Sequence, residues 1–214
     1  MKPFSLKLAA LAAAWLSALP GTALAQSSNC ASLPPGGVGT SLNPNAAQMR
    51  CDLEHAATIR KRALAIYGAL PPSMIEIIDT ASPSGAAYIY EVTADGAKLR
   101  LDARSVPESR GPRCTLRATI PNDTAQTVSN LLVTAGDPLV PDYGAREHVT
   151  LNPDGSRTVR LILDSHDIIT RADTANGARS FSRHAGSEDP VSQLNTLIIG
   201  IANVSPGWSC KAEF

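Results

Sequence analysis

Four cysteines constrain the fold of this 214-residue chain more than any other feature. None of their spacings is the C-x-x-C of a redox motif or a zinc knuckle, so in an oxidising compartment they predict two disulfide bonds. Three pairings are possible. We favour Cys30–Cys51, which would tie a Pro/Gly-rich arm to the following helix, and Cys114–Cys210, which would tie the C-terminal end to the middle of the chain. In the chain-entropy model, loops of these sizes stabilise by roughly 3 and 4–5 kcal/mol.

The first 25 residues predict that the chain reaches such a compartment. Two lysines precede an apolar run over residues 8–19, and Ala23-Leu24-Ala25 then supplies the small-x-small pattern that a signal peptidase cleaves. The apolar run is shorter than the roughly 20 residues that span a bilayer. We therefore expect a signal peptide that is removed near Ala25-Gln26. The mature protein is then expected to be periplasmic or secreted, a soluble protein of the bacterial envelope without a membrane span.

The charge balance of the chain argues against one broad class of partner. The sequence has 19 basic and 19 acidic residues, and loss of the leader removes Lys2 and Lys7 but no acid. The mature chain is then slightly acidic, whereas nucleic-acid-binding domains usually carry a clear basic excess. The sequence also shows no glycine-rich strand-to-helix turn of a nucleotide fold and no paired ligand spacing of a zinc site. We expect no nucleic-acid partner, no metal and no cofactor.

Alternating apolar and polar residues predict a mostly antiparallel sheet. A hairpin over 86–103 turns at Asp95-Gly96, and a second over 147–163 turns near Asp154-Gly155. Residues 114–120 alternate in the same way and predict an extra strand.

The alternation within the first hairpin indicates how the sheet is covered. Leu99 and Leu101 alternate with Arg100 and Asp102, so one face is expected to be buried and the other exposed to water. Helices packed on the buried face complete an α+β fold.

Apolar residues at a period of 3.6 predict three helices. The first begins after Asn43 as N-cap and ends near Gly68, and the second runs from Asn122 or Asp123 to about residue 135. The third starts at Asp189-Pro190, although its apolar run would also suit a buried strand. Before it, the Gly/Ser/Asn-rich residues 173–187 predict a mobile loop.

The chain therefore divides into three parts. Residues 1–25 are the removable signal peptide, and residues 26–42 are an extended N-terminal arm. Residues 43–214 form a single α+β domain, in which a mostly antiparallel sheet of two hairpins plus an extra strand carries helices on one face and is braced by disulfides.

The densest polar cluster follows the apolar strand at 159–163 and consists of Asp164, Ser165, His166 and Asp167. Ser, His and Asp are the residue types of acyl transfer. Adjacent residues rarely aim their side chains at one another, so a catalytic triad would need a partner from elsewhere in the chain. We favour the alternative interpretation that Asp164 or Ser165 caps a short helix running through the next two isoleucines.

Three arginines form a candidate anion site. Arg104, Arg110 and Arg113 bracket Pro107 and Pro112 in a predicted linker, where their guanidinium groups could grip a small anionic ligand. Such a run of arginines is more often solvated, so we favour a solvated segment over an anion site.

These observations favour an exported, disulfide-containing protein that binds an envelope protein or a small ligand without catalysis. The alternative is a secreted hydrolase that uses Ser165, His166 and an acid, Asp164 or Asp167. A third hypothesis is a structural component whose exposed hairpin edge adds to the sheet of a partner. No G-x-S-x-G elbow strengthens the hydrolase hypothesis.

Overall fold

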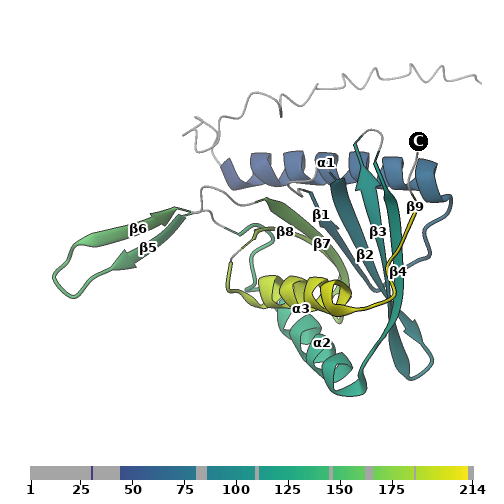
Figure 1. Cartoon of the computed structure of the whole chain (residues 1–214). Helices are drawn as coiled ribbons and strands as arrows, with labels where there is room; N and C mark the ends of the chain where they lie inside the picture. Colours follow the sequence, from purple (N-terminus) through teal and green to yellow (C-terminus); the bar gives the residue numbers. More distant parts are fainter. Residues whose placement is uncertain are drawn as a thin grey trace, which may run out of the picture.

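The computed structural model describes Cys30 and residues 44–80, 86–108, 111–144, 147–161, 166–185 and 187–211. Its elements are shown in Figure 1. The helices are α1 (Pro44–Tyr67), α2 (Asn122–Ala135) and α3 (Pro190–Val204). The strands are β1 (Ile75–Asp79), β2 (Ala86–Asp95), β3 (Lys98–Pro107), β4 (Arg113–Ile120), β5 (Glu147–Leu151), β6 (Arg157–Leu161), β7 (Asp167–Thr174), β8 (Gly177–His184) and β9 (Ser209–Lys211).

Seven strands form one antiparallel sheet in the order β8-β7-β1-β2-β3-β4-β9. The α+β class expected from the sequence is confirmed. The first predicted hairpin, β2–β3, lies inside this sheet with a neighbouring strand on each side. The second, β5–β6, forms a separate two-stranded sheet that projects from the body of the molecule (Figure 1).

Helices cover both faces of the sheet, rather than the single face that the alternation indicated. Helix α1 packs on one face against Ile78 and Ile89, while α2 and α3 cover the other (Figure 1). Asp102 lies on the face under α1 and is only 3% exposed, although its position in the pattern predicted a solvated side chain. Its carboxylate is held there by hydrogen bonds from Arg100 and Arg117.

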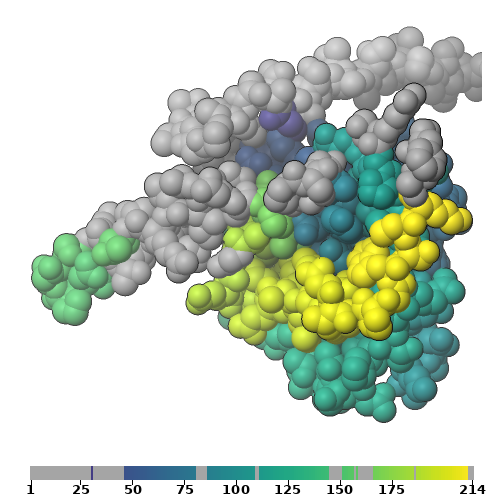
Figure 2. Space-filling view, viewed as in Figure 1, coloured from purple at the N-terminus to yellow at the C-terminus, as the bar shows by residue number. Residues whose placement is uncertain are grey.

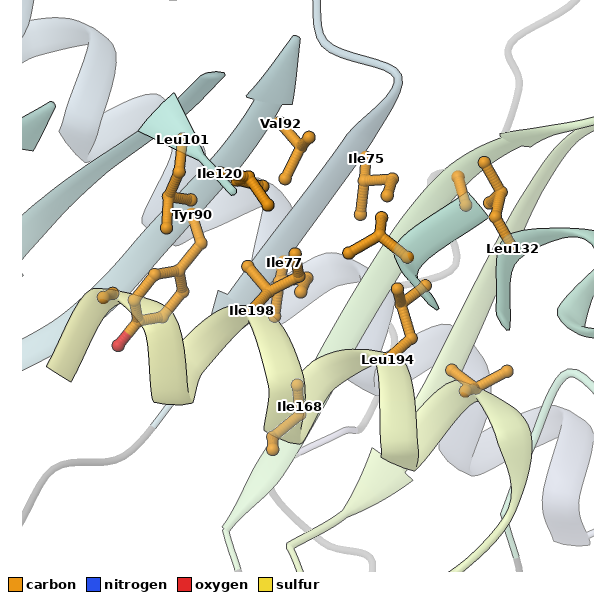
Figure 3. Close-up of a cluster of buried hydrophobic side chains, with 14 of the residues drawn as sticks. Ile75, Ile77, Tyr90, Val92, Leu101, Ile120, Leu132, Ile168, Leu194 and Ile198 are labelled. Atoms are coloured by element: carbon orange, nitrogen blue, oxygen red, sulfur yellow. The ribbon is translucent and has the colours of Figure 1, made fainter. Parts of the chain in front are cut away.

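The larger hydrophobic core lies between the sheet and helices α2 and α3. Figure 3 shows Leu194 and Ile198 of α3 among the sheet residues Ile75 and Ile77, and all four are buried. Asp189 caps α3 by accepting from the amides of the first turn, so the cap and the helix predicted here are confirmed over the alternative of a strand.

Residues 167–184 form a hairpin, β7–β8, that the sequence pattern did not indicate. Its two strands replace both the short helix expected from residue 166 onward and the mobile loop expected over 173–187. Ile168 packs into the core under α3 and Ile169 into the core under α1, because β7 lies between β8 and β1 with both faces covered. An apolar pair of neighbouring residues is typical of such a doubly covered strand, but it resembles one turn of a helix equally well.

Both predicted disulfides are present, Cys30–Cys51 and Cys114–Cys210. Cys114 and Cys210 are direct partners in the β4–β9 pairing, so this bond fastens the last strand to the sheet edge. Among the described residues, no helix is long and apolar enough to cross a membrane.

Candidate functional site

A pocket of about 430 Å³ lies between α3 and the strands β1, β7 and β8. This volume falls within the range of roughly 300–1,000 Å³ that is typical of small-molecule sites. Figure 2 shows α3, in yellow, on the surface of this side of the molecule. The pocket is lined by Asp79, His166, Ile168, Arg183, His184, Ala185, Ser192, Asn195, Thr196, Ile199, Gly200 and Asn203.

His166 is the more accessible of two histidines in this pocket. Its Nε2 lies 2.9 Å from Oδ1 of Asp79, which ends strand β1, and its side chain is 32% exposed. The backbone carbonyl of His166 accepts from the amide of Ala185, so the residue is fixed beside the end of β8. No interaction of Nδ1 occurs within the described part of the chain.

His184 forms a second histidine–carboxylate pair deeper in the fold. Its Nδ1 lies 2.5 Å from Oδ1 of Asp167, its direct partner in the β7–β8 hairpin, and its side chain is fully buried. The ring of Tyr143 meets the imidazole edge-on, with the phenol oxygen 3.4 Å from Nε2. Because both ring nitrogens face protein groups, we interpret this pair as part of the wall rather than as a reactive group.

Arg183 supplies a buried positive charge that is already neutralised. Its Nε donates to Asp189 at 2.8 Å, and its terminal nitrogens donate to the carbonyls of Pro141, Asp142 and Ser182. Burial opposes ionisation of Asp189. Nevertheless the hydrogen bond and charge of Arg183, with the bonds from Ser192, lower the pKa of the Asp189 carboxyl. The guanidinium is therefore committed to the protein and is not an open anion-binding group.

Asn195 and Gly200, both on α3, shape the rest of the pocket. Thr170 of β7 donates to Oδ1 of Asn195 at 2.6 Å, while the buried Nδ2 has no hydrogen-bond partner among the described residues. A Cβ added at Gly200 would meet no atom within 4 Å. The pocket thus combines open space, apolar side chains and a small number of polar groups without a partner among the described residues.

Two residues of the polar cluster that the sequence singled out contact residues of other strands. His166 contacts Asp79, and Asp167 contacts His184. Asp164 and Ser165 lie outside the described residues. Sequence reasoning missed Asp79 and Asn195, because each comes from a distant element and no local spacing links them to His166.

Two of the three arginines of the predicted anion site, Arg104 and Arg113, lie in the described part of the chain. Arg104 lies in strand β3, not in a linker, and forms an ion pair with the fully buried Glu91 on the face under α1. Burial lowers the pKa of its guanidinium. Arg113 begins β4, and Arg110 lies outside the described residues. Neither Arg104 nor Arg113 lines the pocket.

The chemistry of the pocket is that of hydrogen bonding and proton exchange. Within the ranges that the structure describes, no group of three or more His, Cys, Asp or Glu side chains could hold a metal ion. An imidazole oriented by a carboxylate can accept a hydrogen bond or a proton from a bound molecule. No protein-family model, curated protein or solved structure matches this chain.

Proposed function

We propose that this is an exported, disulfide-braced protein that binds a small ligand in the pocket between α3 and strands β1, β7 and β8. The observation that carries the proposal is the buried amide of Asn195, whose Nδ2 has no partner among the described residues although the side chain lines the pocket. Buried polar groups in folded proteins are nearly always hydrogen-bonded, so an unsatisfied one at a pocket favours a ligand.

Two further features support a binding role. Nε2 of His166 contacts Asp79, while Nδ1 has no protein partner among the described residues. An oriented imidazole with one open nitrogen is preorganised for ligand binding. Gly200 weakens helix α3, because glycine is the least favourable helix residue after proline, yet it preserves space in the pocket.

The binding proposal is tested on protein purified from the envelope of its expression host under native conditions. Denaturation should release a bound small molecule that mass spectrometry detects. Filling the pocket with Gly200→Phe should abolish its recovery, whereas Val204→Phe, at an exposed position on the same helix, should not. Equal recovery from the two variants would contradict the proposal, and Gly200→Leu serves as a smaller replacement should the Phe variant unfold.

Export is proposed from the leader and from the two disulfides, since paired cysteines persist in oxidising compartments. N-terminal sequencing of the envelope fraction should begin near Gln26. Alkylation before mass analysis should label no thiol. Protein that retains residues 1–25 and carries labelled cysteines would contradict export.

A partner protein of the envelope is a second candidate, favoured by one observation. The β5–β6 hairpin projects from the body, and its strands pair with each other outside the main sheet (Figure 1). A strand with an open edge can add to the sheet of a partner. Cross-linking in envelope extracts should join a partner to residues 147–161, and replacement of that segment by a short Gly/Ser linker should remove the product. A product unchanged by the replacement would exclude this surface.

The hydrolase hypothesis keeps Ser165 and His166, with His166 as the base, and takes Asp79 as the acid in place of Asp164 or Asp167. Turnover of p-nitrophenyl acetate should then fall to background in His166→Asn and persist in His55→Asn, which removes an exposed histidine on α1. Equal turnover in the two variants would exclude catalysis by His166.

A further inference from the structure

We infer that the pocket takes an uncharged, amide-like group, one that donates a hydrogen bond to Nδ1 of His166 and accepts one from Nδ2 of Asn195. The inference rests on the proposed binding function and specifies the chemistry of the ligand. It follows from the close contact of His166 with Asp79, from the direction of the hydrogen bond that Asn195 makes, and from the charges around them.

The first step concerns the histidine. Nε2 of His166 lies 2.9 Å from Oδ1 of Asp79, and a carboxylate can only accept, so this contact favours the proton of a neutral imidazole on Nε2. In a neutral imidazole the other nitrogen then bears a lone pair. Nδ1 is therefore a hydrogen-bond acceptor, and its ligand must supply an N–H or O–H group.

The second step concerns the asparagine. Thr170 donates to Oδ1 of Asn195, which leaves the amide nitrogen as the unsatisfied atom. An amide nitrogen can only donate, so the ligand must supply an acceptor such as a carbonyl oxygen. A primary amide or a lactam carries both groups on the same side of one carbonyl carbon.

The third step concerns charge. Three carboxylates line the pocket or pair directly with its lining residues, namely Asp79, Asp167 and Asp189, and they face one permanent cation, Arg183. Protonation of both histidines would only bring this set to neutrality. With either histidine neutral the set carries a net negative charge, which disfavours a carboxylate as the preferred group.

The fourth step concerns shape. Ile168, Ala185 and Ile199 give the pocket apolar walls, and the position of Gly200 leaves open space beside them. A ligand that carries an apolar body behind its amide would fill this space. Burial of the apolar body of the ligand would supply affinity, while the two polar atoms of the pocket would fix its orientation.

Three probes of nearly the same shape test the inference: benzamide, benzamidine and benzoate. Benzamide both donates and accepts, benzamidine is a cation that only donates, and benzoate is an anion that only accepts. Titrations followed by NMR should rank benzamide first, with benzoate weaker by about tenfold or more, the equivalent of one lost hydrogen bond. Tightest binding of benzoate or benzamidine, equal binding of all three probes, or binding of none would overturn the inference.

Variants assign the effect to the two residues. Asn195→Asp replaces the donor by an acceptor, and Asp79→Leu removes the acceptor that faces Nε2, so each should weaken benzamide binding about tenfold. Asn195→Leu provides a second replacement should the Asp variant fail to fold, and His55→Asn is the matched control. Unchanged benzamide affinity in folded Asn195 and Asp79 variants would overturn the assignment.

A spectroscopic signature separates hydrogen bonding from a merely structural effect. Nitrogen-15 spectra of labelled histidine should show His166 with its proton on Nε2, and benzamide should shift the Nδ1 resonance. A proton on Nδ1 would overturn the inference. Failure of this inference can be told from failure of the proposed binding function. If a native ligand is released from the natural protein but not from Gly200→Phe, and benzamide does not bind, only the amide chemistry is refuted.

Discussion

One carboxylate, that of Asp189, joins Arg183 of strand β8 to the first turn of helix α3. Its Oδ2 accepts from the buried guanidinium at 2.8 Å, and its Oδ1 accepts from the amides of Val191 and Ser192 at 2.9 and 3.2 Å. Since residues of both β8 and α3 line the pocket, this carboxylate ties two parts of its wall together.

Removing the charge of Asp189 should destabilise the protein, and removing its side chain should destabilise it further. Asp189→Asn keeps a residue that caps helices well but loses the ion pair with Arg183, for an expected cost of about 1–3 kcal/mol in the free energy of unfolding. Asp189→Ala also loses the cap, which adds about 1 kcal/mol. Urea denaturation measures both values. An Ala variant as stable as the Asn variant would show that the cap contributes nothing.

The same carboxylate should make stability depend on pH. The pKa of Asp189 is lowered in the folded protein, so its stabilisation is complete above the unfolded value of about 4 and is lost as pH falls through the folded pKa. The stability difference between the natural protein and Asp189→Asn should therefore shrink below about pH 4. A difference that stays constant from neutral to acid pH would contradict the lowered pKa.

Replacing Gly200 by alanine should stabilise the protein. The new methyl group meets no atom within 4 Å, and alanine is favoured over glycine in a helix by about 0.5–1 kcal/mol. For a chain of this size the melting temperature should rise by about 1–4 °C. Gly68→Ala gives the matched contrast and should be destabilising, because Gly68 ends α1 at a φ of +76° that alanine rarely adopts. A lowered melting temperature in the Gly200 variant would show that the space is not open.

Loss of the Cys114–Cys210 disulfide should cost more stability than loss of Cys30–Cys51. The first closes a loop with a sequence separation of 96 and the second one of 21. Under the chain-entropy model the double variant C114S/C210S should lose about 4–5 kcal/mol, against about 3 kcal/mol for C30S/C51S. Thermal and urea unfolding of both variants gives the comparison. The reverse order would show that native contacts, not loop length, set the contribution.

Ser182 should contribute to stability through its hydrogen bond to Asp52. Its hydroxyl donates to the buried carboxylate of Asp52, which joins β8 to α1 on the face opposite the pocket. Ser182→Ala leaves that carboxylate with one fewer donor and should cost about 1–3 kcal/mol. Ser129→Ala, which removes a local bond on the exposed face of α2, should stay within about 0.5 kcal/mol. Similar effects in urea denaturation would show that Asp52 is satisfied without Ser182.

Local chemistry in the sequence determined the features that need only neighbouring residues. The Asp95-Gly96 turn, the apolar face of α1 and the Asp189-Pro190 start of α3 each depend on residues a few positions apart, and each is confirmed. The two disulfides were also predicted, because four cysteines leave few pairings and because the helix with Cys51 and the strand with Cys114 were placed correctly.

Only the tertiary structure decided which elements meet, and therefore where the site lies. Strand β1 was not predicted, because its short apolar run has no periodicity that separates a buried strand from part of a helix. Its insertion between β7 and β2 brings Asp79 to His166, while α3 brings Asn195 to the same pocket. Contacts between residues so far apart in the chain depend on the packing of the whole sheet, and no local pattern of side chains encodes them.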